Sequence, residues 1–467
     1  MKENSLYGLI YNYLLIRIHY GFYPKGGYLP SILELSNLFG VSTMVIRTAF
    51  KLLRENGYLS YETTERPVVL YDFENPKQAF PEQLLIQGDD FEDFHRTFDL
   101  IFPSIYFCGL SICDNRDLEE LRLILDRSAD AWDSPLVDFL AHLAKRLQNS
   151  LVTDLYYDVT LFSYPTYLDY LAKDKARWKR HHEVLNKKLL EILALKERGN
   201  TAALQTIVNQ AYPPMDWQPV LDSGKERNSP YRWGKSQVCL NTAGEIVSRI
   251  CKGVYPVDTF LPSPRILSEE LSVSLITVRR SIVLLNDLGV AESVNGRGTK
   301  VIPPERGVHK VNWSSPVIRK NTLLYLESLY MLAITCRRLA AFLFPLISPE
   351  EKATLKERIC FIKGQSNAGH ANTLCLQALI SASNLLSLRE VYDKLFSFIV
   401  WGQPLFYLKP HLQLDQYTDL LTESLDSNDA MQFGSALEQA YFATFRSSQS
   451  KAITVGIEEA ERLILPY

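Results

Sequence analysis

Basic and hydroxyl side chains occupy matching positions in two short stretches of this chain. Residues 41–59 read VSTMVIRTAFKLLRENGYL, and residues 273–290 read VSLITVRRSIVLLNDLGV. Arg47 in the first stretch corresponds to Arg279 in the second, and both fall outside the apolar face of a predicted helix. Arginine and threonine at such positions can donate hydrogen bonds to the base edges and phosphates of DNA. The chemistry that these residues suggest is therefore recognition rather than catalysis.

The two stretches belong to a longer repeat. GFYPKGGYLPSILELSNLFG (21–40) aligns without a gap on GVYPVDTFLPSPRILSEELS (253–272), so that Pro30 pairs with Pro262. Every pair in the repeat is offset by 232 residues, and the chain has 467. A repeat that spans half of a chain indicates an internal duplication. We therefore predict that this protein arose by tandem duplication.

The first copy is predicted to form three helices and a hairpin. The helices cover residues 5–20, 31–39 and 42–56, with Ser31 and Ser42 as N-caps and with Leu35 and Leu38 facing inward. Residues 58–71 alternate like a short hairpin. The core face of the third helix, at i, i+3, i+4 and i+7 spacing, consists of Ile46, Ala49, Phe50 and Leu53.

The second copy repeats this pattern. Its predicted helices cover 242–252, 264–271 and 274–287, and Asn295-Gly296 predicts a two-residue hairpin turn. Gly296, Arg297 and Gly298 would give the hairpin a flexible cationic tip. The inward residues of its third helix are Val278, Ser281, Ile282 and Leu285. Three helices with a tight turn before the third, plus a hairpin, are a winged helix-turn-helix, whose last helix enters the DNA major groove.

The predicted fold class is mainly α, with two winged helix-turn-helix heads that are each followed by an all-helical bundle. The segment between the halves is rich in proline and charge, which is typical of a linker. The predicted domains are a degenerate first head (1–74), a helical body (75–212), a linker (213–234), a second head (235–305) and a second helical body (306–467).

Each head resembles the winged-helix domain of the GntR family of bacterial transcription regulators. The family pattern runs G-x-x-x-P-G-x-x-L-P-S-x-R-x-L, then V-S-x-x-T-V-R-x-A-x-x-x-L-x-x-x-G, then a G-x-G-T wing. The resemblance places the DNA-contacting roles of the Pro-Ser-x-Arg arginine, the recognition-helix Thr and Arg and the wing glycine on Arg265, Thr277, Arg279 and Gly296.

The first head departs further from this pattern than the second. Leu33 replaces the Pro-Ser-x-Arg arginine, Val45 replaces the recognition-helix threonine, and the wing TTERP lacks glycine. The second head is therefore expected to hold DNA better. The predicted DNA-binding residues are Ser31, Ser42, Arg47 and Lys51 in the first head, and Arg265, Ser274, Thr277, Arg279, Arg280, Gly296 and Arg297 in the second.

The helical bodies resemble the FCD-type effector domains of the same family, many of which hold a divalent metal through one Asp and three His. Asn372 and Cys375-Leu376 stand where an Asp and a His would fall in the second body, and Leu136 and Phe139-Leu140 stand there in the first. His181 and His182 point about 100° apart on a helix, which does not suit one ion. We expect no metal and no cofactor, and an apolar or aromatic effector between the helices is the ligand considered instead.

Composition and the absence of known motifs argue against several other classes of protein. The net charge of −3 excludes a globally basic coat for nucleic acid but not a local basic surface. Seven scattered cysteines without a CxxC motif indicate reduced thiols rather than a disulfide framework or zinc finger. The most apolar stretch (330–347) carries Arg337 and Arg338 at its centre, which disfavours a membrane span. The chain has no GxGxxG, GxxxxGK[ST], HExxH or GxSxG motif, so no enzyme is expected.

The sequence thus predicts a cytoplasmic, ligand-responsive transcription regulator that binds double-stranded DNA sequence-specifically. One chain is expected to act as a pseudo-dimer on an asymmetric operator. A homodimer that uses only its second heads is one alternative. A protein-interaction or ligand-sensing scaffold, in which the first or both heads no longer bind DNA, is the other.

Overall fold

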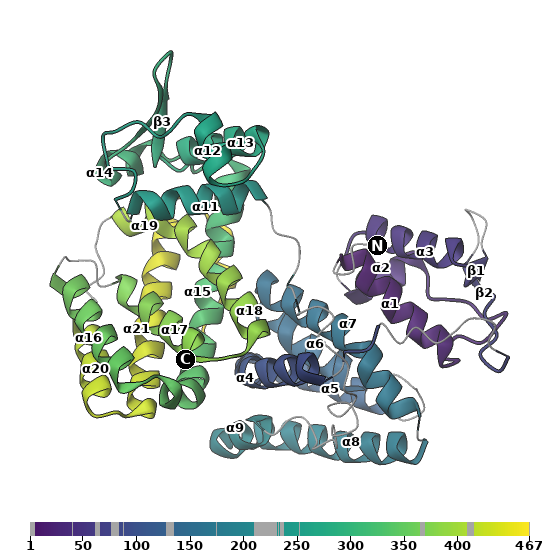
Figure 1. Cartoon of the computed structure of the whole chain (residues 1–467). Coiled ribbons are helices and arrows are strands. Elements are labelled where there is room, and N and C mark those ends of the chain that lie inside the picture. The colour runs from purple at the N-terminus through teal and green to yellow at the C-terminus, as the bar shows by residue number, and fades with distance from the viewer. Residues whose placement is uncertain are drawn as a thin grey trace. The chain divides into compact units, whose positions relative to one another are not determined.

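The computed structural model describes residues 5–39, 41–60, 66–75, 84–86, 88–127, 135–173, 175–209, 231, 233, 238–251, 253–364, 369–408 and 415–466. Contacts divide the chain into two compact units, Met1–Leu147 with Val152–Lys235, and Gln148–Leu151 with Ser236–Tyr467. Each unit contains one small head with a two-stranded sheet and one helical body (Figure 1). The predicted fold class, two winged helix-turn-helix heads and helical bundles, is confirmed.

The first head consists of α1 (Leu6–His19), α2 (Ile32–Phe39), α3 (Thr43–Glu55), β1 (Leu59–Ser60) and β2 (Val68–Val69). The strands pair antiparallel, Leu59 with Val69, and Tyr28 adds a bridge to Val68. The side chains of Ile46, Ala49, Phe50 and Leu53 are fully buried against α1, as the spacing predicted. Their burial leaves the opposite side of α3 at the surface.

The second head has the same element order: α11 (Val238–Cys251), α12 (Pro264–Glu270), α13 (Leu275–Asp287), β3 (Ala291–Val294) and β4 (Gly298–Val301). Its bridge from Phe260 to Lys300 occupies the position of the Tyr28 bridge in the first head. Ser281 is buried because its hydroxyl donates to the carbonyls of Cys239 and Thr277 at 2.8 and 2.9 Å. In Figure 1 the β3–β4 hairpin projects away from the body of its unit.

Two local predictions were wrong, and a third held only in part. Leu38 is 40% exposed, and Phe39 is buried in its place, because Phe39 and Leu35 lie one turn apart on the same face of α2. The second wing turns through three residues, since Val294 pairs with Gly298. Ser42 is the N-cap residue of α3, as predicted, but its side chain makes no capping hydrogen bond. The remaining turn and wing predictions at Gly40 and 63–65 lie outside the described residues.

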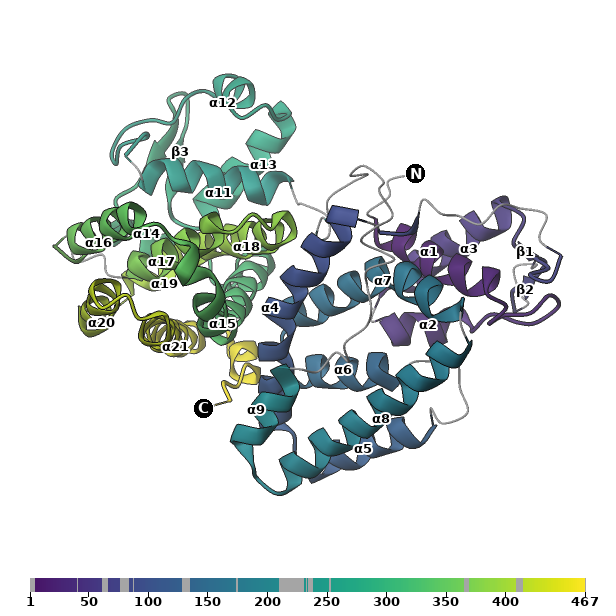
Figure 2. The ribbon, with the colours of Figure 1, turned by 60° about the horizontal axis from the view of Figure 1, so that its bottom comes forward.

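The first body comprises α4 (Gly88–Ile112), α5 (Asn115–Arg127), α6 (Pro135–Arg146), α7 (Ser150–Ala172), α8 (Lys175–Glu197) and α9 (Thr201–Asn209). Helix α4 lies against α6 and α9, and α8 lies against α5 and α9 (Figure 2). The α4–α6 approach is close, because a Cβ on Gly109 would come within 2.7 Å of the Leu143 carbonyl oxygen. Of the predicted linker (213–234), only Tyr231 and Trp233 are described, and both are buried; the Tyr231 hydroxyl donates to Asp158 of α7 at 2.7 Å.

Arg17 joins the first head to its body. This side chain is 6% exposed and donates from Nη1 to the hydroxyls of Tyr13 (2.7 Å) and Tyr164 (3.1 Å). Its guanidinium also lies over the rings of Phe22 and Tyr23 at 4.9 and 5.3 Å. A buried arginine is stabilised only when such partners replace its water, so these contacts fix α1 against α7.

The second body comprises α15 (Pro316–Leu343), α16 (Pro349–Gly364), α17 (Gly369–Ala382), α18 (Leu386–Ile399), α19 (Gln403–Tyr407), α20 (Asp415–Asp426) and α21 (Ala430–Thr454), and α14 (Pro304–Gly307) connects it to the head. Helices α15 and α21 pack along their lengths at its centre. The stretch Pro316–Leu346 is long and apolar enough to cross a membrane by length and composition, but 67% of its apolar 18-residue window is buried in this body. It therefore has the features of a core helix.

Candidate nucleic-acid interface

The exposed side of the third helix carries the predicted DNA-reading residues in each head. In α3, Arg47 and Lys51 are exposed, and Lys51 pairs with Glu55 at 3.7 Å on the surface. In α13, Arg279 and Arg280 are exposed beside the buried Val278. The buried stripe of each helix thus orients its arginines outward, where a major groove would lie in a helix-turn-helix complex.

The N-terminus of α13 is more completely capped than that of α3. The Ser274 hydroxyl accepts a hydrogen bond from the Thr277 backbone N–H at 3.1 Å and lies 2.8 Å from the Thr277 hydroxyl. These bonds fix the first turn of the helix and leave Ser274 exposed at its end. The first head has Val45 in place of Thr277, and Ser42 makes no capping bond. Only the second head therefore presents an ordered pair of hydroxyls at this point.

The second helices differ at the position of the family's arginine. Arg265 in α12 has an 88% exposed side chain that pairs with Glu269, itself 69% exposed, at 3.4 Å. Such an exposed pair is weak and leaves the guanidinium available to a phosphate. In α2 the equivalent Leu33 is 63% exposed. Ser31 and Glu34 form a reciprocal capping box, with N–H bonds of 2.6 and 3.2 Å, so the Ser31 hydroxyl is occupied in ordering α2.

The second wing has a cationic tip that depends on glycine. Gly296 and Gly298 have φ values of +71° and +109°, which L side chains rarely adopt. Between them, exposed Arg297 lies over the ring of Phe260 with 5.9 Å from Cζ to the centroid. This contact holds the arginine on the outer surface of the wing. The first wing's Arg66 is also exposed.

Two exposed apolar side chains stand next to the arginines. Met44 is 68% exposed in α3, and Ile276 is 62% exposed at the same position of α13. Their exposure follows from the helical period, because each lies three residues before Arg47 or Arg279 and so shares its face. Both heads therefore combine a basic and an apolar group at the start of the recognition helix.

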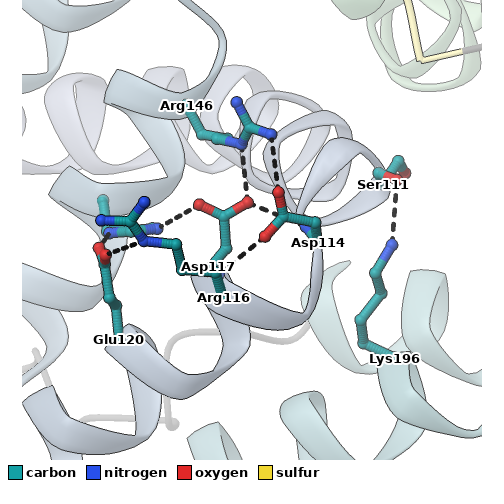
Figure 3. Close-up of polar contacts among 8 residues, drawn as sticks. Ser111, Asp114, Arg116, Asp117, Glu120, Arg146 and Lys196 are labelled. Atoms are coloured by element: carbon teal, nitrogen blue, oxygen red, sulfur yellow. Dashed lines mark hydrogen bonds and ion pairs between the residues drawn. The ribbon is translucent and has the colours of Figure 1, made fainter.

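The first body contains a dense cluster of charged groups between α5 and α6. Asp117 accepts from Arg146 Nε at 2.7 Å and lies 3.2 Å from His142 Nε2, while Asp114 and Asp117 cap the start of α5 reciprocally (Figure 3). Burial alone would raise the pKa of Asp117, but the hydrogen bonds from Asp114, Arg146 and His142 outweigh it and lower the pKa. All the charges are paired locally, so the cluster joins helices rather than forming an open site.

The residues considered for a metal site make other contacts in each body. His181 is hydrogen-bonded to Tyr167, and burial, with a smaller contribution from His182, lowers the pKa of His181 to about 4. Asn372 donates to Thr444 at 3.3 Å, and Cys375 is fully buried. Within the described ranges, no three His, Cys, Asp or Glu side chains are grouped so that they could hold a metal ion.

Sequence reasoning did not identify an aromatic ladder in α4. Phe94, Phe98, Phe102 and Tyr106 follow one another at i, i+4 spacing, with ring centroids 4.7, 5.4 and 5.3 Å apart. The spacing is visible in the sequence and would have identified one helix face. The ladder borders a cavity of about 140 Å³ that also includes α6, α7 and α8.

Comparison with known protein families finds a match in each of the two heads. The model of "Bacterial regulatory proteins, gntR family" matches residues 6–66 and 240–301. The two heads thus have the helix-turn-helix fold of the GntR-type DNA-binding domain. Proteins of that family use this domain in transcription regulation. A search of curated proteins gave no match.

Several solved structures are similar at low identity. Streptococcus agalactiae GntR is 16% identical (45% of this chain, 99% of that chain, TM-score 0.21), and E. coli McbR/YncC is 16% identical (44% and 94%, TM-score 0.25). A third structure, of Lar, which controls the expression of the Listeria monocytogenes agr system, is 14% identical (46% of this chain, 98% of that chain, TM-score 0.22).

Proposed function

We propose, from the premise that both heads match the GntR-type DNA-binding domain, that this chain is a sequence-specific transcription regulator that acts on double-stranded DNA in the cytoplasm. The observation that carries the proposal is the exposed face of α13. There Arg279 and Arg280 project from a helix whose other side is buried and whose N-terminus is capped by Ser274. This arrangement suits base contacts by the arginines and phosphate contacts by the helix N-terminus.

The second head is proposed to read its half-site more strictly than the first. Arg265, Thr277, Gly296 and Arg297 supply groups that could reach phosphates, base edges or the adjacent groove. The first head would contribute Arg47, Lys51, the start of α2 that Ser31 caps, and Ser42 at the start of α3. Leu33 and Val45 cannot donate a hydrogen bond, so this head would add affinity with less discrimination.

The two heads of one chain are proposed to act as a pseudo-dimer on an operator with unlike half-sites. Two heads with different contact residues would favour two different sequences, whereas a homodimer with identical heads favours a palindrome. A small-molecule effector bound in a helical body is proposed to modulate DNA binding. The domain divisions at 74, 212, 234 and 305 remain part of this proposal.

A DNA shift assay with genomic fragments tests the proposal on the full chain. We expect binding that weakens steeply between about 50 and 200 mM salt, because phosphate contacts release counterions. Arg279→Ala should cost about 1–3 kcal/mol and relax the preference at one base position. Arg358→Ala is the matched control, since Arg358 is an exposed arginine on α16 of the second body.

A scaffold without DNA binding is the competing function, and the exposed Leu33 and Met44 of the first head favour it. Retention of fragments that is indifferent to salt and equal for Arg279→Ala and the control would support that competitor. A fall in affinity confined to Arg279→Ala would support the regulator.

A further inference from the structure

The first body contains a partly open cavity whose residues take no part in the proposed DNA contacts. Its volume is about 140 Å³, and its walls come from α4, α6, α7 and the start of α8. A cavity of about 150 Å³ in another protein is large enough for a benzene molecule. The cavity of this chain therefore has the size of one substituted aromatic ring.

Aromatic side chains form most of the wall. The stacked rings of Phe102 and Tyr106 lie 5.3 Å apart at 7° on α4, and Tyr156 of α7 meets Phe102 edge-on at 6.2 Å. Flat walls of this kind offer a planar molecule both stacking and edge-to-face contacts, worth about 0.5–1.5 kcal/mol per ring pair beyond burial. Leu136 and Leu140 of α6 complete the apolar side.

The polar groups in the wall disfavour an anion. Among the described lining residues there is no lysine or arginine, and the acidic residue is Asp99, which pairs with His95 at 3.2 Å. Burial lowers the pKa of His181 to about 4, so its imidazole is uncharged at neutral pH. A carboxylate moved from water into this cavity would lose its hydration without gaining an unpaired cation, because His95 already pairs with Asp99. Thr160 and the hydrogen-bonded Tyr167–His181 pair can still exchange a neutral hydrogen bond with a ligand.

We infer that this cavity is a binding site for a small, uncharged aromatic molecule that carries one hydrogen-bonding group. The site would work without a metal, because the wall offers stacking surfaces and neutral hydrogen-bond donors.

Tyr164 connects this site to the first head. Its ring lines the cavity, its hydroxyl accepts from Arg17 Nη1 at 3.1 Å, and the Tyr13 ring lies 4.5 Å away. A ligand packed against Tyr164 would therefore act on the contact that fixes α1 to α7. The site stands by itself, whereas its use in controlling DNA binding rests on the proposed function.

Ligand-observed fluorine NMR on the full chain, without DNA, tests the site independently of DNA binding. The probes are 4-fluorobenzyl alcohol and 4-fluorobenzoate, which share a ring and differ in charge. We expect the native chain to broaden the alcohol signal and to bind the benzoate at least about tenfold more weakly, a difference of about 1.4 kcal/mol. Ser163→Phe should abolish binding by filling the cavity, while Ser163→Ala should retain it.

Thr160→Phe, from the same wall, provides a second filling variant if Ser163→Phe does not fold by circular dichroism. Undiminished alcohol binding by a folded filling variant, or tighter binding of the benzoate, would overturn the site. Coupling is tested by Arg17→Met, which leaves the lining intact and should change the alcohol affinity about fivefold or more through linkage. Arg54→Met, a change of an exposed arginine in the same head that is not among the proposed DNA contacts, should not change it. Equal affinities for the two variants would remove the link but not the site.

Discussion

The two heads share the same order of helices and strands but differ in the side chains at matching positions. Arg265 of the second head and Leu33 of the first occupy the same place on the second helix, and both are well exposed. The guanidinium can bond a phosphate, whereas the isobutyl group can only make apolar contact. The difference in predicted DNA recognition therefore lies in side-chain chemistry at a shared position.

The exposed Ile276 suggests a specific apolar contact, which rests on the proposed DNA binding. It lies on the same face as Arg279, and in the major groove its match is the C5-methyl group of thymine. Once the operator is mapped, replacing thymines of the second half-site one at a time by deoxyuridine removes single methyl groups. At one position we expect a loss of about 0.8 kcal/mol, from one buried methyl group.

A double-mutant cycle makes this test specific. Ile276→Ala should weaken binding and also abolish the sensitivity to that methyl group, because the two changes remove the same contact. Ile464→Ala is the control, since Ile464 is 57% exposed in the second unit but lies outside the head. The contact is refuted if the Ile276→Ala chain remains as sensitive to deoxyuridine as the native chain.

At the scale of elements, the connection from the second head to its body depends on two glycines in direct contact. Gly289 ends the turn after α13, and Gly307 ends α14. A Cβ on Gly307 would lie 2.1 Å from the Gly289 carbonyl oxygen, and a Cβ on Gly289 would lie 2.2 Å from the Gly307 oxygen. Backbone meets backbone here, so no side chain can move aside to make room.

We therefore predict that Gly307→Ala lowers the free energy of unfolding by about 1–3 kcal/mol, the cost typical of overpacking. Its φ of −62° is ordinary, so the effect would come from the close approach and not from backbone strain. Thermal unfolding of the full chain measures it. Gly244→Ala in α11 is the control, because its nearest neighbour is 3.5 Å away and alanine favours a helix. An equal melting temperature for both variants would contradict the prediction.

At the scale of the whole molecule, the proposal makes one chain sufficient for one operator. Native mass spectrometry of the protein–DNA complex should then give one chain per site, with a footprint covering two unlike half-sites about 34 Å apart along the DNA. In this complex Arg279→Ala should reduce affinity by about 1–3 kcal/mol and Arg47→Ala by less, since the first head lacks the supporting donors.

The contrary outcome is equally concrete. Two chains on a symmetric site, with Arg47→Ala indistinguishable from the native chain, would show that second heads pair across a homodimer. The first head would then have a structural role, through contacts such as those of Arg17, and would not bind DNA.

Local pattern was sufficient to predict the heads. The i, i+3, i+4, i+7 spacing of Ile46, Ala49, Phe50 and Leu53 can be satisfied only by a helix buried on one side, and that burial also determines that Arg47 points outward. The repeated motif then predicted that Arg279 also lies on the exposed side of a helix that is buried on its other side. These features depend on neighbours within one or two helical turns, which the sequence displays directly.

Tertiary structure decided the features that depend on distant partners. Arg17 interrupts an apolar run in the sequence, yet it is buried, because Tyr164 arrives from 147 positions away to accept its hydrogen bond. The α4 ring ladder is visible as a spacing, but it borders a cavity only because α6, α7 and α8 pack around it without filling it. The burial of a side chain and the volume of a cavity depend on contacts from several helices at once. The periodicity along one helix does not show which other helices pack against it.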